Sequence, residues 1–237
     1  MTQTLTRSND RKVANAVSPN GKTPTIANTF GLPAGKAYSC PGATDFCESI
    51  CYAGKLEKIY KGVRNVLTRN FDILKDASYS DTVSMLSAMI DSFRADCVKR
   101  KADMLFRIHW DGDFFSAGYV AAWSVVIANN PDIQFWVYTR VPTAALFLSS
   151  KNHANLGLYF SADPDNIDIA KTLEAKGINI AYVDKSFSNG KEAFSNAVRC
   201  PENNKAIELI STKGSACVRC GLCVNGRKSV LFSTTKK

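Results

Sequence analysis

The sequence lacks the segments that mark membrane and secreted proteins. Its 237 residues contain no uninterrupted apolar run long enough to cross a bilayer. Residues 1–22 (MTQTLTRSNDRKVANAVSPNGK) are polar and basic, without the apolar centre of a secretory signal. We therefore expect a cytoplasmic protein with no membrane partner, in a compartment where thiols stay reduced and disulfides are rare.

The sequence also lacks an internal repeat and a glycine-rich phosphate loop, which argues against a solenoid and against a P-loop site. Histidine is scarce: the chain has only His109 and His153, and His153 lies in a predicted turn. Cysteine is not scarce, because eight are present. In a reducing compartment eight cysteines favour metal or cluster binding over a disulfide framework.

Acidic residues are outnumbered by basic ones. Lys and Arg total 30 against 21 for Asp and Glu, which gives a formal net charge of +9. A basic chain favours a polyanionic partner such as nucleic acid. The charge is spread along the chain, however, and no aromatic-basic motif of the RNA-binding kind is present. A soluble protein that happens to be basic is the alternative interpretation.

The hydrophobic pattern predicts an α/β fold. Residues 1–23 lack periodic apolar positions and are predicted to form a flexible basic arm. In residues 24–195 predicted strands alternate with predicted helices, after two helices over 64–77 and 81–101, the second with Asp81 as its N-cap. The predicted strands cover 104–110, 133–139, 156–162 and 178–184, with weaker candidates within 23–33 and 229–232. Strands joined by helical crossovers imply a parallel sheet.

We therefore expect a partial or complete (β/α) barrel, with an open doubly wound sheet as the alternative. Residues 196–237 form a C-terminal cysteine-rich extension. Side chains alternate between the two faces of each predicted strand. Arg107, His109 and Asp111 would share one face of the second strand, and Phe106, Ile108 and Trp110 the other. A repeatedly polar face predicts a binding cavity inside the barrel.

Ligands of parallel α/β folds sit at the carboxyl ends of the strands. Polar residues follow the predicted strands there, in the stretches HWDGDFF, YTR, SAD and DK. The candidate catalytic residues are His109, Asp111, Tyr138 and Arg140, and the candidate cofactor-binding residues are Asp113, Ser161, Asp163 and Lys185.

The C-terminal cysteines have the spacing of a cluster-binding segment. Cys200, Cys217, Cys220 and Cys223 follow the pattern C-x16-C-x2-C-x2-C. The close triplet is similar to the start of the bacterial ferredoxin run, and the remote Cys200, followed by Pro201, can supply the fourth ligand. Structural zinc sites usually come as two separated pairs. We therefore favour an iron–sulfur cluster, of the [4Fe–4S] type, over zinc.

A second set of cysteines lies in the stretch SCPGATDFCESICYAGK. Cys40, Cys47 and Cys51 follow the pattern C-x6-C-x3-C within residues 40–51, after the first predicted strand. Three thiolates on a [4Fe–4S] cluster leave one iron open to another ligand. Cys200 can instead join this loop, so that one cluster takes ligands from both regions. Cys97 lies on a helical stripe and is predicted to be a small core residue.

The stretches SCPGATDFCESICYAGK, FRIHWDGDFFSAGYVAAW and FWVYTR, with the final cysteines, resemble the gene product 88 family of mycobacteriophages and their relatives. The resemblance covers most of the chain from about residue 22. It implies a phage protein that works in the host cytoplasm, and it implies no biochemistry, because the family has no characterised function.

The chain more distantly resembles radical S-adenosylmethionine (SAM) enzymes. These have a partial (β/α) barrel and a three-cysteine [4Fe–4S] loop after the first strand. The resemblance implies that Asp113, in the stretch DGD, binds the methionine amine of SAM. It also implies one-electron chemistry fed by a donor such as ferredoxin or flavodoxin. The spacing departs from the family's C-x3-C-x2-C, and no glycine-rich adenine motif is evident.

Three functions follow as hypotheses. The first is an iron–sulfur protein with a radical-SAM-like barrel and one or two clusters. The second is a non-catalytic iron–sulfur protein that binds nucleic acid or a host factor. The third is a structural protein stapled by zinc.

Overall fold

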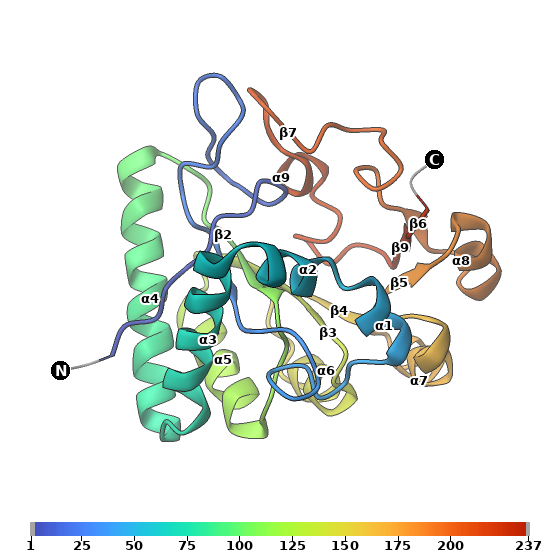
Figure 1. The fold of residues 1–237 in the computed structure, drawn as a ribbon, viewed down its shortest axis with the longest axis horizontal. Coiled ribbons are helices and arrows are strands. Elements are labelled where there is room, and N and C mark those ends of the chain that lie inside the picture. Colours follow the sequence, from blue (N-terminus) through green and yellow to red (C-terminus); the bar gives the residue numbers. More distant parts are fainter. Residues whose placement is uncertain (1–2, 236–237) are drawn as a thin grey trace.

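The computed structural model describes residues 3–235 as an α/β fold built on one seven-stranded sheet (Figure 1). All pairings between its neighbouring strands are parallel. In spatial order the strands are β1 (Thr29–Gly31), β2 (Leu105–Asp111), β3 (Gln134–Thr139), β4 (Leu156–Ala162), β5 (Asn179–Asp184), β9 (Val230–Ser233) and β6 (Val198–Arg199). The predicted α/β class and parallel sheet are confirmed.

The first five strands lie side by side in chain order. A doubly wound sheet reverses its strand order part-way, so this arrangement is that of a singly wound sheet. Strands β1 and β6 are the two edges, and they do not pair with each other over residues 3–235. The complete barrel that the sequence allowed is therefore not formed.

Helices cover one face of the sheet, which we call the helix face. They are α3 (Lys61–Lys75), α4 (Tyr79–Arg100), α5 (Ala117–Asn129), α6 (Pro142–Ser150), α7 (Ile167–Glu174) and α8 (Phe187–Ala193). The helices predicted over 64–77 and 81–101 are confirmed as α3 and α4. The N-cap of α4 is Ser78 and not Asp81, because the Ser78 side chain accepts a hydrogen bond from the Asp81 backbone N–H.

The main core lies between the helix face and these helices. Phe106, Phe135 and Phe160 point from successive strands into it and are fully buried. Helices α4 and α5 add stripes that include Phe93 and Trp123. Burying each such aromatic side chain stabilises the fold by about 2–3 kcal/mol. None of the helices within residues 3–235 combines the length and apolarity of a membrane span.

The two ends of the chain cover the opposite face of the sheet, which we call the inner face (Figure 1). Val13 of the N-terminal segment packs with Trp136 of β3 and Val224, and Val13 and Trp136 are fully buried. The Cys217 backbone N–H donates to the Lys12 carbonyl at 3.0 Å, so the two ends also contact each other. Part of the predicted arm therefore packs on the sheet, with Val13 and Ala14 fully buried, and its flexibility stays a prediction. Single apolar residues and ion pairs hold the packed part, and such contacts have no periodic signature.

Short elements complete the fold. They are α1 (Asp45–Ile50), α2 (Tyr52–Ile59), the 3₁₀ helix η1 (Pro164–Asn166), α9 (Ala216–Cys220) and the antiparallel pair β7 (Ile210–Ser211) and β8 (Gly214–Ser215). The first three lie in the loops at the carboxyl ends of the strands, which we call the carboxyl edge. Helix α9 lies over the inner face (Figure 1).

Candidate functional site

The first cysteine loop lies on the carboxyl edge, where the sequence predicts it. Gly112, directly after β2, has φ of 80°, and a Cβ there would lie 2.5 Å from the Ser39 hydroxyl. A Cβ on Gly42 would overlap the carbonyl oxygen of Arg140, directly after β3. These contacts leave no room for a side chain. The loop is therefore pressed against the ends of two neighbouring strands.

Three free thiols come from this loop; we call Cys40, Cys47 and Cys51 the first thiol group. Thr44 caps α1 by accepting a hydrogen bond from the Cys47 backbone N–H at 3.0 Å. The Cys51 sulfur accepts one from the Gly54 backbone N–H at 3.3 Å, at the start of α2. Burial raises the pKa of all three thiols, and Asp113 raises that of Cys40 further. They are neutral at pH 7 unless a cation binds them.

Asp113 connects two strand ends at the carboxyl edge. One of its oxygens accepts a hydrogen bond from the Thr139 hydroxyl at 2.6 Å, and the other accepts one from the Arg140 backbone N–H at 2.7 Å. The Phe114 backbone N–H donates to it as well, at 2.7 Å. Burial raises the pKa of Asp113, although these three donors oppose the rise. Both carboxylate oxygens are engaged, so Asp113 fixes the end of β2 to the end of β3.

Arg140 links the next strand to the cysteine loop. Its Nη1 donates to Asp163 Oδ2 at 2.5 Å, and the Thr44 hydroxyl donates to the same oxygen at 2.5 Å. Asp163 is fully buried and follows β4. The charge of Arg140 also acts on the Cys47 thiol. The candidates Arg140 and Asp163 therefore lie beside the first thiol group, and their roles remain predictions.

Asp111 is the other acidic candidate beside these thiols. One oxygen accepts a hydrogen bond from the Gly112 backbone N–H at 2.8 Å, and Oδ2 is buried without a partner in residues 3–235. Burial, together with the neighbouring Glu57, raises the pKa of Asp111 to about 8. At pH 7 this carboxyl group is mostly protonated and can donate a hydrogen bond.

His109 does not share a face with Arg107 and Asp111, so this part of the alternation prediction is wrong. Its φ is 58°, and the pairing of β1 with β2 shifts register around it. The ring therefore points to the helix face, where it packs between Phe114 and Trp123 and its Nε2 lies 2.8 Å from the Tyr119 hydroxyl. Burial, with a contribution from Arg107, lowers the pKa of His109 to about 3. A catalytic role for His109 stays a prediction.

The other candidates lie in three places. Ser161 lies within β4, one residue before its end, and Lys185 directly follows β5. The Lys185 carbonyl accepts a hydrogen bond from the Thr235 hydroxyl. Tyr138 lies on the inner face, 5.5 Å from the ring of Tyr159. It packs with Cys223 of the C-terminal segment and not with the first thiol group. Tyr138 and Arg140 are only two residues apart in the sequence. Tyr138 nevertheless lies on the inner face, whereas Arg140 lies at the carboxyl edge beside the first thiol group.

The C-terminal cysteines, which we call the second thiol group, lie over the inner face and are free. Cys200 follows β6 and packs with Tyr159, and Cys217 and Cys223 pack with Trp136. Gly221, with φ of 67°, ends α9 so that the chain turns back between Cys220 and Cys223. Cys200 lies close enough to Cys217 and Cys223 to act on their pKa values. Cys200 therefore belongs with the second thiol group in space.

Two partly buried cations that the sequence did not assign to a site lie beside this group. Lys12 pairs with Glu202 at 2.5 Å and lies over the Phe232 ring. Burial alone lowers the pKa of Lys12, but Cys217, Cys200 and Glu202 together raise it above its ordinary value. The Arg107 guanidinium lies over the Tyr138 ring, and its nearest carboxylate oxygen is 3.5 Å away on Asp10. No sequence signal marks Lys12, whereas Arg107 stood on the predicted polar face.

Burial and the two nearby cations act in opposite directions on the thiols of the second group. Burial raises the pKa of Cys217 to about 12 and that of Cys223 to about 11, while Lys12 and Arg107 oppose the rise at Cys217. Thiols in such a setting ionise when they bind a metal. Within residues 3–235, no three His, Cys, Asp or Glu side chains are placed to hold a metal ion. Both metal assignments therefore remain predictions.

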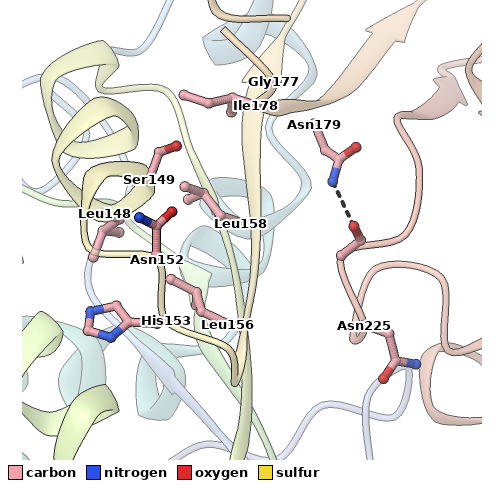
Figure 2. Close-up of a pocket in the computed structure, with 11 residues that line it drawn as sticks. Leu148, Ser149, Asn152, His153, Leu156, Leu158, Gly177, Ile178, Asn179 and Asn225 are labelled. Carbon is pink, nitrogen blue, oxygen red and sulfur yellow. Dashed lines mark hydrogen bonds between the residues drawn. The ribbon is translucent and has the colours of Figure 1, made fainter.

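The inner face is not an open polar cavity. Trp136 and Tyr159 are fully buried there by the two chain ends. A pocket of about 200 Å³ lies instead at the amino ends of the strands, where β4 and β5 begin (Figure 2). Leu156 and Leu158 line it, and Asn179 beside them donates to the Gly226 carbonyl at 2.8 Å. This pocket contains none of the candidate site residues.

With this geometry established, sequence comparison places the chain among known proteins. The family model of gene product 88 matches residues 3–226. The chain belongs to the gene product 88 family. It is 64% identical over 236 residues to the gene 88 protein of Mycobacterium phage L5, covering 98% of this chain and 99% of that one. The gene 88 protein of Mycobacterium phage D29 is 61% identical over 237 residues, with the same coverage.

The resemblance to the gene product 88 family is therefore confirmed. The resemblance to radical SAM enzymes stays a prediction. No solved structure matches the chain significantly. The names of the gene 88 proteins state no activity, so the function of the family has to be argued from the site itself.

Proposed function

We propose that this member of the gene product 88 family is an iron–sulfur protein. In this proposal Cys200, Cys217, Cys220 and Cys223 hold a closed [4Fe–4S] cluster on the inner face. Cys40, Cys47 and Cys51 hold an open one on the carboxyl edge, and the open site carries out radical-SAM-like one-electron chemistry. The observation that carries the proposal is the pair of partly buried cations, Lys12 and Arg107, beside the second thiol group.

A buried cation is costly unless an anion lies close to it. Lys12 has one carboxylate partner, but Arg107 has only Asp10 at 3.5 Å, and its Nε is buried without a partner in the described part of the chain. Neutral thiols do not compensate these charges. Four thiolates around a cluster bring net negative charge to this place. The two cations are thus the counter-charges that an anionic cluster needs.

The first thiol group supports a different role. Three thiols lie where the loop meets the ends of β2 and β3, and the loop supplies no fourth cysteine. An iron–sulfur cluster with one open iron supplies single electrons to a bound ligand such as SAM. Around it, the neutral Asp111 offers a hydrogen-bond donor, and Arg140 offers a cation beside Cys47. Both groups fit the carboxylate of a bound ligand.

The experiment starts from protein purified without exposure to air. Iron and acid-labile sulfide are measured, and the protein is then incubated with SAM and dithionite. We expect 5′-deoxyadenosine to form and Cys47→Ser to abolish its formation. Cys97→Ser is the matched control, because Cys97 is a buried thiol of α4 outside both groups. If the iron is intact and no 5′-deoxyadenosine forms, the SAM chemistry is wrong and the cluster assignment stands.

The two other hypotheses are separated by the same sample. A colourless protein with stoichiometric zinc is the result that the zinc-stapled alternative predicts. An intact cluster without SAM cleavage is the result that the non-catalytic alternative predicts. An electron donor of the ferredoxin or flavodoxin class is needed only if SAM is cleaved, so dithionite replaces it in the first experiment.

A further inference from the structure

A groove of about 610 Å³ runs along the exposed side of α3, and none of the thiols lines it. We call it the α3 groove. Its size lies within the range of small-ligand sites, roughly 300–1,000 Å³. The lining that matters for the argument consists of Tyr38, Arg64, Asn65, Thr68 and Arg69. From its charge and its exposed aromatic ring we infer that the α3 groove binds single-stranded nucleic acid.

The groove is positively charged. Arg64 makes no ion pair or side-chain hydrogen bond to another described residue. Arg69 donates through Nη1 to the Thr4 carbonyl at 2.8 Å, so a neutral acceptor holds it and its charge stays uncompensated. The acidic residue in the lining, Asp72, already pairs with Lys75 at 2.8 Å. Phosphate groups are the partners that two such arginines fit best.

An aromatic ring lies at the same place. Tyr38 is 45% exposed. It is held in position by Phe71 of α3, with ring centroids 6.3 Å apart and an interplanar angle of 80°. A fixed ring with nearly half of its surface free is suited to stacking on a base. An anionic ligand without aromatic bases would offer nothing for the Tyr38 ring to stack on.

Polar side chains on the same helix face complete the groove. Asn65 and Thr68 lie one and four residues after Arg64, so all three share one side of α3. Neither side chain hydrogen-bonds to another group in the described residues. They are free to contact base edges or sugars. In a duplex the base faces are stacked on one another and hidden, so a free ring beside arginines favours a single strand.

The test measures binding by fluorescence anisotropy with labelled single-stranded DNA and RNA of about 12 nucleotides, within the usual site sizes of about 4–16. We expect binding at low salt that weakens as salt rises. Tyr38→Leu removes stacking and should weaken binding about 5- to 150-fold. Arg64→Gln should weaken binding to all sequences and reduce the slope of log affinity against log salt by about one.

Matched controls are Tyr79→Leu and Arg100→Gln, which change an exposed tyrosine and an exposed arginine of α4. They should leave binding unchanged. Duplex DNA of the same sequence and polyglutamate are the competing ligands. The inference is overturned if no oligonucleotide binds at low salt, if duplex or polyglutamate binds as tightly as the single strand, or if the controls weaken binding as much as Tyr38→Leu. Each groove variant is first compared with the parent chain by circular dichroism and thermal unfolding.

Discussion

The two thiol groups of this protein lie in opposite electrostatic settings. The first group, Cys40, Cys47 and Cys51, sits among the carboxyl groups of Asp111, Asp113 and Asp163, with Arg140 as the cation closest to Cys47. The second group is flanked by Lys12 and Arg107 and lies against the aromatic side chains of the inner face. One group has three thiols and the other has four.

This difference indicates different tasks. Four thiols with buried counter-charges, covered by both ends of the chain, are suited to a closed centre that stabilises the fold or relays electrons. Three thiols among hydrogen-bonding groups at the carboxyl edge are suited to a centre that a ligand completes. The predictions that follow test this contrast, from the largest expected effect to the smallest.

Removing one thiol of the second group should have the largest effect. Cys217→Ser takes a ligand from a site covered by the chain ends, and we expect about half of the iron to be lost together with a clear fall in thermal stability, because metal binding is coupled to folding. Iron analysis and thermal unfolding measure both. Cys97→Ser should change neither the iron nor the spectrum. Equal iron in the two variants would contradict the closed centre.

Asp113→Asn should destabilise the carboxyl edge. Hydrogen bonds to a charged group contribute about 1.5–3 kcal/mol each, and the amide keeps one acceptor oxygen while its NH₂ faces a donor. We expect the free energy of unfolding to fall by about 2–4 kcal/mol in denaturant titrations. Asp168→Asn, on the exposed side of α7, should change it by less than about 0.5 kcal/mol. A small effect of Asp113→Asn would mean that the edge is not fixed by this residue.

Removing the charge of Lys12 should weaken the second centre selectively. Loss of a group that supports metal ligands typically costs about 10- to 100-fold in metal affinity. We expect Lys12→Gln to lose iron to a chelator faster than the parent chain does, while Lys12→Arg keeps most of it. Iron retained equally by Lys12→Gln would contradict the counter-charge that distinguishes the second group from the first.

The pH dependence of stability should reveal that His109 is buried on the helix face, apart from either thiol group. The His109 pKa of about 3 in the folded chain lies below the ordinary value of about 6.5, so the unfolded chain binds a proton that the folded chain does not. Stability therefore falls as the pH drops below about 6.5. Between about pH 7 and about pH 5.5 His109 should contribute about 1 kcal/mol of this fall.

Denaturant titrations of the parent chain and His109→Gln at the two pH values isolate this contribution. Glutamine keeps a hydrogen-bonding partner for the Tyr119 hydroxyl. The variant should lose about 1 kcal/mol less than the parent chain on acidification. Equal losses would contradict a buried, uncharged His109 on the helix face.

How far the sequence predicts the fold depends on periodicity. In β3 and β4 the side chains alternate as a regular strand requires, with Phe135 on the helix face and Tyr159 on the inner face. The prediction of alternation failed at His109, where a positive φ breaks the alternation within β2. A single backbone torsion leaves no trace in the hydrophobic pattern.

The candidate site was predictable where the topology decides it. Residues after parallel strands meet at one edge, so Asp113, Arg140 and Asp163 do lie together. Lys12 and the place of Cys200 were not predictable, because they depend on how the two chain ends fold over the inner face. Those contacts join residues far apart in the sequence, and no local pattern encodes them.

The central claim is that both thiol groups hold iron and sulfide. The most direct test is the iron, acid-labile sulfide and zinc content of protein purified without exposure to air, measured for the parent chain, Cys47→Ser and Cys217→Ser. We predict iron and sulfide in about equal amounts in the parent chain, and about half of each in either variant. Stoichiometric zinc without iron in the parent chain, or full iron in both variants, would contradict the account.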